Sequence, residues 1–428
     1  MDRVVEKILR LDNEIQIPPD KSITHRGIIL AALAKGTTIL TNPLICKDTL
    51  STLHCVNQLG AEHDIRENSI KIISPGYEKL HKSQNILDAG NSGTTIRLLS
   101  GVLASLPFKS IITGDDSLKR RPMKRIIDPL KMMGAEIESE NLQPPLQITG
   151  RELRPFDFDL SIPSAQVKSA IILAALNTIG LTKIREKTRT RDHTERMLKL
   201  FGSSISRYET TSGEVLNVLG KQKLYCTRIN IPGDFSSAAY FIGLSLMIPG
   251  SRLVLKDINL NPTRTGMLKI LKKQDVIKIS DFRIISGEPR GTLIIRYKKL
   301  NSFKIRKEEI PAVIDEIPIL CVIATQIEGT SIIQGATELK YKESNRLSAI
   351  QENIKQMGGD IEVDKNDDII IRGATKLKGS EINPNKDHRI CMAFTIAGMI
   401  ADGKTTIKDV ACVDYSFPGF FDIIDSLG

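Results

Sequence analysis

Basic side chains recur at the starts of short apolar stretches, among serine, threonine and asparagine residues. The segments are 21–26 (KSITHR), 91–97 (NSGTTIR), 119–122 (KRRP), 342–346 (KESNR) and 387–389 (DHR). If each stretch is a helix, its first turn presents free N–H groups and a partial positive charge, which bind phosphate or carboxylate. A lysine or arginine in that turn opposes the helix dipole unless an anion accompanies it. The residues to which we therefore assign anion binding are Lys21, Arg26, Arg121, Lys342, Arg346 and Arg389.

Helix capping is the competing interpretation for the polar residues of such starts. Serine, threonine, asparagine and aspartate side chains accept hydrogen bonds from the first N–H groups of a helix. We assign capping to Asp192, Asp234, Ser236 and Asn261. Capping does not explain the basic residues, because lysine and arginine carry no acceptor.

Two carboxylates are candidates for general acid–base work. Asp315 lies in 314–318 (IDEIP), and Glu343 directly follows Lys342. Nearby cations favour the ionised form of a carboxylate, so Asp315 is suited to accept a proton from a hydroxyl group. Helix capping is the alternative role for Asp315.

The other motifs give weaker evidence for a function. Segment 398–405 (GMIADGKT) matches the P-loop pattern, but that motif needs a strand before it and a helix after it. Here the helix-like segment 390–400 precedes and the β-branched segment 405–407 follows, so we interpret Gly403 as a turn. The six histidines are dispersed and none joins cysteine at zinc-ligand spacing, so we predict no metal site. For His25 and His388, contact with an anion and a structural role are both open.

The elements that must position these residues repeat about every 70 residues. An aliphatic residue, three further residues and a glycine end helix-like stretches at 56–60, 130–134, 198–202, 354–358 and 424–428, with a degenerate copy at 271–275. Glycine there is the expected left-handed helix cap. Between these endings lie six small, apolar helical stretches, several followed by β-branched runs such as 36–40 and 329–333. We predict an α/β (α+β) chain of six units, three in each of two domains, with the buried helices central.

Composition sets the broad class. A chain of 428 residues with 41% hydrophobic and 26% charged residues predicts a soluble protein of two or three domains. The net charge of +10 is dispersed and aromatic residues are 4%, which favours small anions over nucleic acid as partners. Six cysteines without a CxxC pair indicate free thiols in a reducing compartment. No signal peptide and no apolar run near the roughly 20 residues of a membrane span are present, so we expect a cytoplasmic protein without a membrane partner.

Taken together, the motifs resemble the 5-enolpyruvylshikimate-3-phosphate synthases, a family of enolpyruvyl transferases. The two longest matching segments are 87–97 (LDAGNSGTTIR) and 342–346 (KESNR). Further segments fit the family pattern in the same order, namely 120–123 (RRPM), 164–169 (SAQVKS), 191–197 (RDHTERM), 314–318 and 387–389. The likeness runs from 18–22 (PPDKS) to 417–418 and so covers essentially the whole chain.

The resemblance implies two globular domains, each of three βαβαββ pseudo-repeats. One domain would be discontinuous, with residues 1–19 and 235–428, and would surround an inserted domain of residues 20–234, with the active site in the cleft between them. The implied reaction transfers the enolpyruvyl group of phosphoenolpyruvate to the 5-hydroxyl of shikimate 3-phosphate and releases phosphate by addition and elimination. This step belongs to the shikimate pathway of chorismate and aromatic amino-acid biosynthesis. The implied transferase needs no cofactor, is a monomer and is a target of glyphosate.

The same resemblance assigns roles to residues. Shikimate 3-phosphate would be bound by Lys21, Ser22, Arg26, Ser164, Ala165, Gln166, Asp315 and Lys342. Phosphoenolpyruvate would be bound by Lys21, Gly93, Arg121, Gln166, Arg346 and Arg389, with Arg191 assisting. The implied catalytic residues are Asp315, Lys21 and Glu343. Asp315 would accept the 5-hydroxyl proton, and either Lys21 or Glu343 would handle the proton at the methylene carbon.

Three positions depart from the family pattern. Tyr415 stands where one branch has a lysine, Asn345 stands where aspartate is common, and segment 271–275 lacks the glycine.

Two alternatives remain at this stage. The sister family of UDP-N-acetylglucosamine enolpyruvyl transferases shares the fold, but Lys21 with Arg26 suits a sugar-acid phosphate better, and segment 110–122 lacks that family's cysteine. A non-catalytic anion- or nucleic-acid-binding protein is the alternative of another class. Dispersed charge and few aromatic residues disfavour it.

Overall fold

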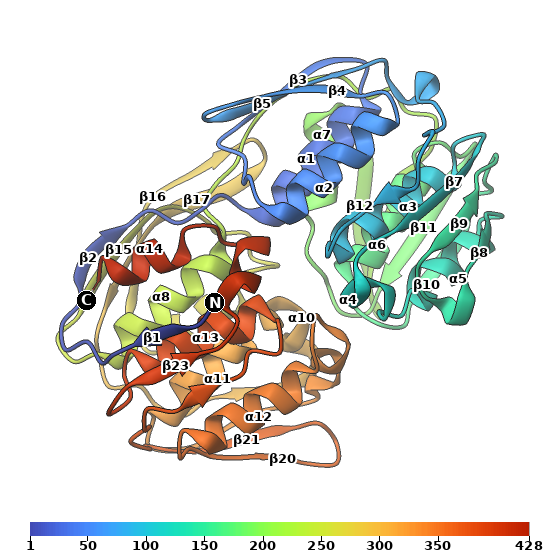
Figure 1. Ribbon diagram of the computed structural model, residues 1–428. Helices are drawn as coiled ribbons and strands as arrows, with labels where there is room; N and C mark the ends of the chain where they lie inside the picture. Colours follow the sequence, from blue (N-terminus) through green and yellow to red (C-terminus); the bar gives the residue numbers. More distant parts are fainter. Residues whose placement is uncertain (428) are drawn as a thin grey trace. The chain divides into compact units, whose positions relative to one another are not determined.

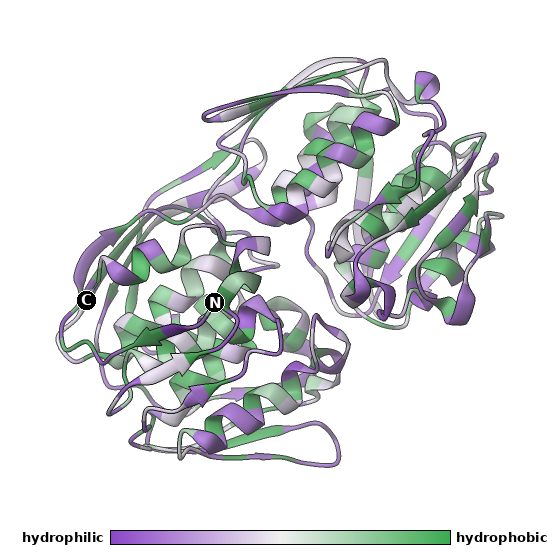
Figure 2. Ribbon diagram, in the orientation of Figure 1, coloured by the Kyte–Doolittle hydropathy of each residue, from purple (hydrophilic) through white to green (hydrophobic). Residues whose placement is uncertain are grey.

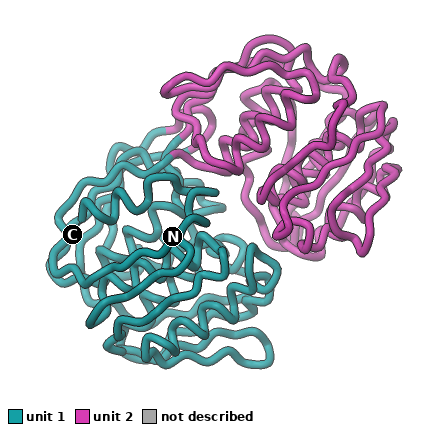
Figure 3. Tube along the Cα trace, in the orientation of Figure 1, with its two compact units in different colours: residues 1–18, 232–283, 289–428 teal, residues 19–231, 284–288 magenta. Residues whose placement is uncertain are grey.

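The structure is a computed structural model that describes residues 1–427, and the chain divides into two compact units (Figure 3). Unit 1 comprises Met1–Pro18, Pro232–Arg283 and Pro289–Gly428, and unit 2 comprises Pro19–Ile231 and Ile284–Glu288. The second crossing between the units therefore lies at 231/232, three residues before the predicted position at 234/235. The five-residue segment Ile284–Glu288 of unit 2 was not predicted.

Each unit repeats one arrangement of elements three times (Figure 1). A strand leads into an inner helix, a second strand and an outer helix, and a hairpin follows in every repeat except the last one of unit 1. The inner helices are α1 (Lys21–Leu33), α3 (Gly93–Ala104) and α6 (Ala165–Ala175) in unit 2, and α8 (Phe235–Met247), α11 (Ile317–Thr325) and α13 (His388–Gly398) in unit 1. The outer helices are α2 (Lys47–Gln58), α5 (Lys124–Met132), α7 (His193–Leu200), α9 (Gly266–Lys272), α12 (Arg346–Gln356) and α14 (Phe420–Asp425). Short helices α4 (Asp116–Lys119) and α10 (Ile310–Val313) lead toward α5 and α11.

Residues 1–427 form six small sheets, of which five have the same four-stranded topology and the sixth has three strands. The sheets of unit 2, in spatial order, are β14 (Arg228–Asn230), β3 (Gly36–Thr41), β5 (Ser69–Ser74), β4 (Glu62–Arg66); β6 (Leu87–Asp88), β7 (Lys109–Thr113), β9 (Leu146–Thr149), β8 (Glu136–Glu138); and β10 (Asp157–Leu160), β11 (Leu181–Glu186), β13 (Gly213–Leu219), β12 (Ile205–Thr210). Those of unit 1 are β16 (Ile277–Ile285), β17 (Glu288–Arg296), β15 (Arg252–Asn259), β2 (Asp12–Ile15); β18 (Lys304–Ile305), β19 (Gly329–Ile333), β21 (Ile369–Gly373), β20 (Asp360–Val363); and β1 (Arg3–Val5), β23 (Thr405–Ile407), β22 (Glu381–Ile382). In each sheet, a first strand runs parallel to the strand that follows an inner helix, and the other neighbour of that second strand is antiparallel. In four sheets the first strand precedes the same inner helix. In the other two, β14 precedes α8 but pairs with β3 after α1, and β2 precedes α1 but pairs with β15 after α8.

Strands distant in sequence complete three of these sheets. In unit 2, β14 follows all three repeats and pairs with β3 of the first. In unit 1, β2 at the start of the chain pairs with β15, and β1 pairs with β23. The repeat is therefore circularly closed in both units, which is why the start of the chain belongs to unit 1.

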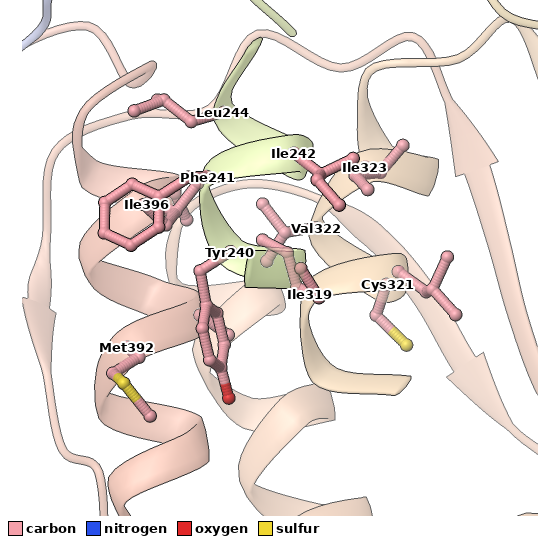
Figure 4. Packing of buried hydrophobic residues seen from close by; sticks show 14 of the residues in the cluster. Tyr240, Phe241, Ile242, Leu244, Ile319, Cys321, Val322, Ile323, Met392 and Ile396 are labelled. Atoms are coloured by element: carbon pink, nitrogen blue, oxygen red, sulfur yellow. The ribbon is translucent and has the colours of Figure 1, made fainter. Parts of the chain in front are cut away.

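Each unit has its own apolar core around its inner helices, and hydrophobic residues gather on these helices (Figure 2). In unit 1, α8, α11 and α13 pack against one another. Figure 4 labels Tyr240, Ile319 and Met392, one from each helix, within this core. Because each fully buried leucine or isoleucine side chain contributes about 1.5–3 kcal/mol, these cores hold the inner helices firmly. The packing of these helices therefore fixes the positions of the polar side chains in their first turns.

The expected left-handed endings are present. Gly60, Gly134, Gly202 and Gly358 all have positive φ. In the degenerate copy, Asp275 takes the left-handed conformation itself, with φ of 54°. Aspartate is one of the few residues other than glycine that tolerate this region. Gly428 of the final copy lies outside the described residues.

Helices α3 and α6 approach each other closely at Gly101. A Cβ atom at this position would lie 2.1 Å from the carbonyl oxygen of Ala170. Only glycine permits this approach, so Gly101 fixes the distance between the two helices whose first turns carry Gly93 and Gln166.

Candidate functional site

In unit 1, charged side chains meet at Arg346, the first residue of α12. Its Nε lies 2.8 Å from Oδ2 of Asp387, its Nη1 lies 3.5 Å from Oδ1 of Asp315, and its Nη2 contacts Glu343. The Arg346 side chain is 1% exposed. Burial disfavours a charged guanidinium, but the negative charges of Asp387 and Glu343 outweigh this and raise the pKa of Arg346 above its ordinary value.

Arg389, in the first turn of α13, shares Asp315 with Arg346. Its Nε lies 3.4 Å from Oδ1 of Asp315, and its Nη1 donates to the Asp315 backbone carbonyl at 3.4 Å. Burial opposes the charge of Arg389, but Asp315 is the largest of the neighbours that raise its pKa above the ordinary value. The Asp315 carboxylate thus lies between two guanidinium groups, which favours its ionised form.

Asp387 connects the residues of this cluster through hydrogen bonds. Its Oδ1 accepts from the backbone N–H of Arg389 at 2.9 Å and so caps α13, while Oδ2 accepts from Arg346 and from Ser344. One carboxylate therefore fixes the starts of both α12 and α13. Asp387 was not among the predicted site residues, although the pattern DHR placed it directly before a helix.

A second buried set lies at the starts of α8 and α11. Asp234 caps α8 and also receives Nη2 of Arg264 at 2.9 Å, and Ser236 donates to Glu316. Asp234 and Glu316 both raise the pKa of Arg389, after Asp315 and Tyr240. The capping prediction for Asp234 is confirmed.

In unit 2, the first turn of α1 is tied to three neighbouring elements. Asp20 caps the helix, and Lys21 Nζ lies 3.0 Å from Oδ2 of Asp48 in α2. Arg26 donates from Nε to Thr194 of α7 at 2.8 Å and from Nη2 to Ser169 of α6 at 3.0 Å. The Arg26 side chain is buried, so its guanidinium is held in one orientation.

Hydrogen bonds between side chains connect the starts of α3 and α6. Arg97 Nη1 donates to Oε1 of Gln166 at 2.8 Å, and Gln166 Nε2 donates to Oγ1 of Thr94 at 3.0 Å. A Cβ on Gly93 would lie 2.7 Å from Nη1 of Arg97 and 3.2 Å from Nη1 of Arg121. Two guanidinium groups therefore face the backbone at Gly93, and this arrangement of N–H donors suits an anion.

Arg121 follows α4 and is held by the loop before α3. Its Nη2 donates to Oδ1 of Asn91 at 2.7 Å, and Asn91 in turn donates to Oδ2 of Asp115 at 2.8 Å. Asp115 caps α4. The basic segment 119–122 is thus anchored to the segment 91–97.

A buried lysine was missed by sequence reasoning. Lys168 in α6 is 0% exposed, with Nζ 2.9 Å from Glu186 of β11 and 2.8 Å from Glu195 of α7. Arg207 adds a second cation 2.7 Å from Glu195. Glu186 also accepts hydrogen bonds from Thr190, which precedes Arg191, and Glu195 follows Arg191 in the sequence. The network therefore holds the chain in place on both sides of Arg191. The segment SAQVKSA predicts an apolar helix. Its sequence does not indicate that two carboxylates from other elements pair with the lysine.

Several capping predictions are wrong. Asp192 stands at the cap of α7 without capping it, because its oxygens bind Arg189 and Arg196. Asn261 closes a local turn by accepting from Thr263, and α9 begins five residues later. Ser236 lies inside α8 and donates to Glu316. Asp315 caps no helix, because Glu316 occupies the cap of α11.

Ser22, Ser164 and Ala165 stand at helix starts as predicted, whereas Lys342 lies outside a helix start, four residues before α12 begins. Ser22 lies in the first turn of α1, Ser164 caps α6 with Ala165 as its first residue, and Lys342 follows the 3₁₀ helix η4 (Ala336–Tyr341). Within unit 2 the structure groups Gly93, Arg97, Arg121 and Gln166, and within unit 1 it groups Asp315, Glu343, Arg346 and Arg389.

The departures from the family pattern also have local explanations. Asn345 caps α12 by accepting from the N–H of Ser348. Tyr415 ends η5 (Val410–Tyr415). Gly403 has φ of 92° between α13 and β23, so the P-loop match is a turn, as predicted.

Residues 1–427 lack two features that would point to other functions. No group of three or more histidine, cysteine, aspartate or glutamate side chains in these residues is arranged to hold a metal ion. Within the same range, no helix is both long enough and apolar enough to cross a membrane.

Comparisons with known proteins agree over the whole chain. The family model for EPSP synthase (3-phosphoshikimate 1-carboxyvinyltransferase) matches residues 5–424. A 3-phosphoshikimate 1-carboxyvinyltransferase from Thermodesulfovibrio yellowstonii is 45% identical over 100% of both chains, and one from Shouchella clausii is 42% identical over 97% of this chain and 96% of its own. The solved EPSP synthase of Acinetobacter baumannii has a TM-score of 0.85 and 38% identity, covering 99% of this chain and 97% of its own. The enolpyruvyl transferase NikO from Streptomyces tendae shares the fold, with a TM-score of 0.80 and 14% identity over 99% of this chain and 97% of its own.

The six circularly closed repeats and the basic helix starts define a protein with the two-domain enolpyruvyl transferase fold. Within that class, the chain belongs to the EPSP synthase family, and it is a transferase of the shikimate pathway and aromatic amino-acid biosynthesis. The resemblance and the fold class inferred from the sequence are confirmed.

Proposed function

We propose that this enzyme transfers the enolpyruvyl group of phosphoenolpyruvate to the 5-hydroxyl of shikimate 3-phosphate. The observation that carries the proposal is the position of Asp315 between two guanidinium groups, 3.5 Å from Arg346 and 3.4 Å from Arg389. A carboxylate kept ionised in this way can accept the proton of the attacking hydroxyl. The same two arginines supply charge-assisted donors for the carboxylate and departing phosphate of phosphoenolpyruvate.

The groups in unit 2 bind the substrates in this proposal. Lys21, Ser22 and Arg26 at the start of α1, and Ser164, Ala165 and Gln166 at the start of α6, hold shikimate 3-phosphate together with Asp315 and Lys342. Gly93, Arg121 and Gln166 hold phosphoenolpyruvate together with Lys21, Arg346 and Arg389, and Arg191 assists. The grouping of Gln166, Gly93 and Arg121 around Arg97 supports this assignment.

The mechanism is addition followed by elimination. In the addition, the 5-hydroxyl oxygen bonds to C2 of phosphoenolpyruvate, Asp315 takes the hydroxyl proton and C3 gains a proton. In the elimination, C3 loses a proton and the C2–O bond to phosphate breaks, which leaves the enol ether. Contact with Arg346 favours a deprotonated Glu343, and contact with Asp48 favours a protonated Lys21. We therefore assign proton delivery to Lys21 and proton removal to Glu343.

Three further properties belong to the same proposal. Glyphosate competes with phosphoenolpyruvate at Gly93, so its inhibition is relieved at high phosphoenolpyruvate. The enzyme acts as a monomer on two small anions, without nucleic acid or a membrane. It works in the cytoplasm, where its six cysteines stay as the free thiols seen in the structure.

Substitution of Asp315 tests the assignment that carries the proposal. Asp315→Asn keeps the shape of the side chain and removes the proton acceptor, so we expect turnover to fall by roughly two to four orders of magnitude. Binding of shikimate 3-phosphate, measured by calorimetry, should change much less. Asp257→Asn is the matched control, because Asp257 also pairs with two arginines of unit 1 but has no assigned role. Near wild-type turnover of Asp315→Asn would show that another group is the base.

A further inference from the structure

A chain of short hydrogen bonds runs from α1 to the cap of α3 inside unit 2. His25 Nδ1 lies 2.6 Å from Oγ1 of Thr52, and Thr52 Oγ1 lies 2.6 Å from Oγ1 of Thr95. Thr95 Oγ1 donates to Oγ of Ser92 at 2.7 Å. All four side chains are at most 1% exposed. The chain therefore links the interior faces of α1, α2 and α3.

Counting protons along this chain fixes its direction. Each hydroxyl has one proton, and that of Thr95 goes to Ser92. Thr52 must then supply the proton of its 2.6 Å contact with Thr95, in preference to its longer 3.4 Å contact with the Asp48 carbonyl. Because the Thr52 proton is used, His25 must donate its Nδ1–H to Thr52. The ring is thus the Nδ1–H tautomer, and Nε2 has no hydrogen-bond partner among the described residues.

The surroundings of His25 keep the ring neutral. Burial lowers the pKa of His25 well below its ordinary value, and the positive charges of Lys21 and Arg26 act in the same direction. A neutral ring that donates from Nδ1 carries no proton on Nε2.

The two ends of the chain are functionally placed. His25 lies next to Arg26 and one turn after Lys21 and Ser22, in the first turns of α1. Ser92 caps α3, accepting from the Thr95 N–H at 3.1 Å, and Gly93 follows it directly. The chain therefore joins the two helix starts assigned above to shikimate 3-phosphate and to phosphoenolpyruvate.

We propose that His25 is a positioning residue that acts through Thr52 and Thr95 to hold the first turn of α3, with Gly93, in the geometry that binds phosphoenolpyruvate. The inference rests on the proposed function for the roles of α1 and α3. His25 touches no substrate in this account. Its contribution is to fix the Ser92 cap, from which the free N–H groups of α3 take their direction.

Three variants and one control test the role. Thr52→Val removes the hydroxyl at nearly constant shape, His25→Leu removes the donor, and His25→Asn keeps an N–H donor near the position of Nδ1. We expect Thr52→Val and His25→Leu to raise KM for phosphoenolpyruvate by about three- to tenfold, the effect of one or two lost hydrogen bonds. KM for shikimate 3-phosphate should change less than twofold, and His25→Asn should stay near wild type.

Thr38→Val is the control, because Thr38 is a fully buried threonine of unit 2 outside the chain. Its thermal midpoint is expected to move without a selective change in either KM. The inference is overturned if Thr38→Val raises KM for phosphoenolpyruvate as much as Thr52→Val does. Equal rises in both KM values for Thr52→Val, or an effect of His25→Asn as large as that of His25→Leu, would also overturn it.

A second measurement does not depend on turnover. The ¹⁵N spectrum of the imidazoles, with the His25 signals assigned by their loss in His25→Asn, should show a protonated Nδ1 and a bare Nε2. A protonated Nε2 would overturn the chain itself. If the wild-type enzyme released no phosphate with both substrates while Nδ1 was protonated, the proposed function would fail. The chain would then be structural, and the positioning role would be overturned.

Discussion

Arg346 and Asp387 form a buried ion pair, with Nε of Arg346 2.8 Å from Oδ2 of Asp387 and side chains 1% and 0% exposed. The pair joins the first residue of α12 to the cap of α13, and these two helices carry both arginines that flank Asp315. Loss of either partner therefore changes both the stability of unit 1 and the geometry around Asp315.

Substitution of Asp387 should be costly. In Asp387→Ala the buried guanidinium of Arg346 loses its most deeply buried carboxylate partner and α13 loses its cap, so we expect the free energy of unfolding to fall by about 3–5 kcal/mol. Asp387→Asn keeps the cap acceptor and should lie between Ala and wild type. Urea denaturation measures both, and a loss under about 1 kcal/mol for Asp387→Ala would contradict the stabilising role of the pair.

The stability of the enzyme should fall as the pH drops below about 6.5, the ordinary pKa of histidine. The pKa of His25 is lowered well below this value in the folded state, so below pH 6.5 the unfolded chain binds a proton that the folded chain does not. His25 therefore contributes full stability above pH 6.5 and loses it at up to about 1.4 kcal/mol per pH unit as the pH falls. Denaturation of wild type and His25→Asn between pH 7 and pH 5 tests this, and parallel curves would contradict it.

Lys168 should stabilise unit 2 only while it is paired with the carboxylates of Glu186 and Glu195. Lys168→Met leaves Glu186 and Glu195 with an uncompensated buried charge, and we expect a loss of about 3–5 kcal/mol. Arg207 offsets part of the charge on Glu195. The triple variant Lys168→Met, Glu186→Gln, Glu195→Gln should recover much of the loss, because it removes the charges together. A triple variant no more stable than the single one would contradict this account.

Two glycines in inner helices should differ sharply when replaced by alanine. At Gly101 the new Cβ would lie 2.1 Å from a backbone oxygen of α6, which cannot yield without moving the helix. At Gly27 it would meet the flexible end of Leu40, with Cδ2 at 2.9 Å. We expect Gly101→Ala to lower the free energy of unfolding by at least about 1–3 kcal/mol and Gly27→Ala to cost clearly less. Thermal denaturation in parallel decides, and equal losses would show that α3 and α6 are not held at this distance.

Gly93→Ala should act on phosphoenolpyruvate rather than on folding. The added methyl group would lie 2.7 Å from Nη1 of Arg97, whose side chain can move but would leave Gln166. We expect a several-fold higher KM for phosphoenolpyruvate, weaker inhibition by glyphosate and an unchanged thermal midpoint. Steady-state kinetics at fixed shikimate 3-phosphate measures the first two quantities. An unchanged KM for phosphoenolpyruvate would remove Gly93 from the proposed site.

Much of the fold follows from local signals in the sequence. The helix endings at Gly60, Gly134, Gly202 and Gly358 are visible because positive φ selects glycine almost by itself. The inner helices are visible because they are apolar on nearly every face. The strands that close the repeats from elsewhere, β1, β2 and β14, are not visible, because pairing across the length of the chain leaves no local pattern.

The basic residues of the candidate site were also predictable, but their partners were not. A lysine or arginine at a helix start violates a local preference, and this marks Lys21, Arg346 and Arg389. The compensating carboxylates lie far along the chain, because Asp48 belongs to the outer helix after Lys21 and Asp387 to the cap of the inner helix after Arg346. These pairs form only through tertiary packing. Asp315 was found as a carboxylate in a polar segment, but its place between two arginines needed the structure.

Phosphate release from phosphoenolpyruvate tests the central claim most directly, with shikimate 3-phosphate as the acceptor in one reaction and UDP-N-acetylglucosamine in another. The account predicts release with shikimate 3-phosphate alone. Release with the nucleotide sugar alone would contradict the acceptor assignment while leaving enolpyruvyl transfer intact. Release with neither acceptor, from folded protein, would contradict the enolpyruvyl-transfer function proposed for this chain.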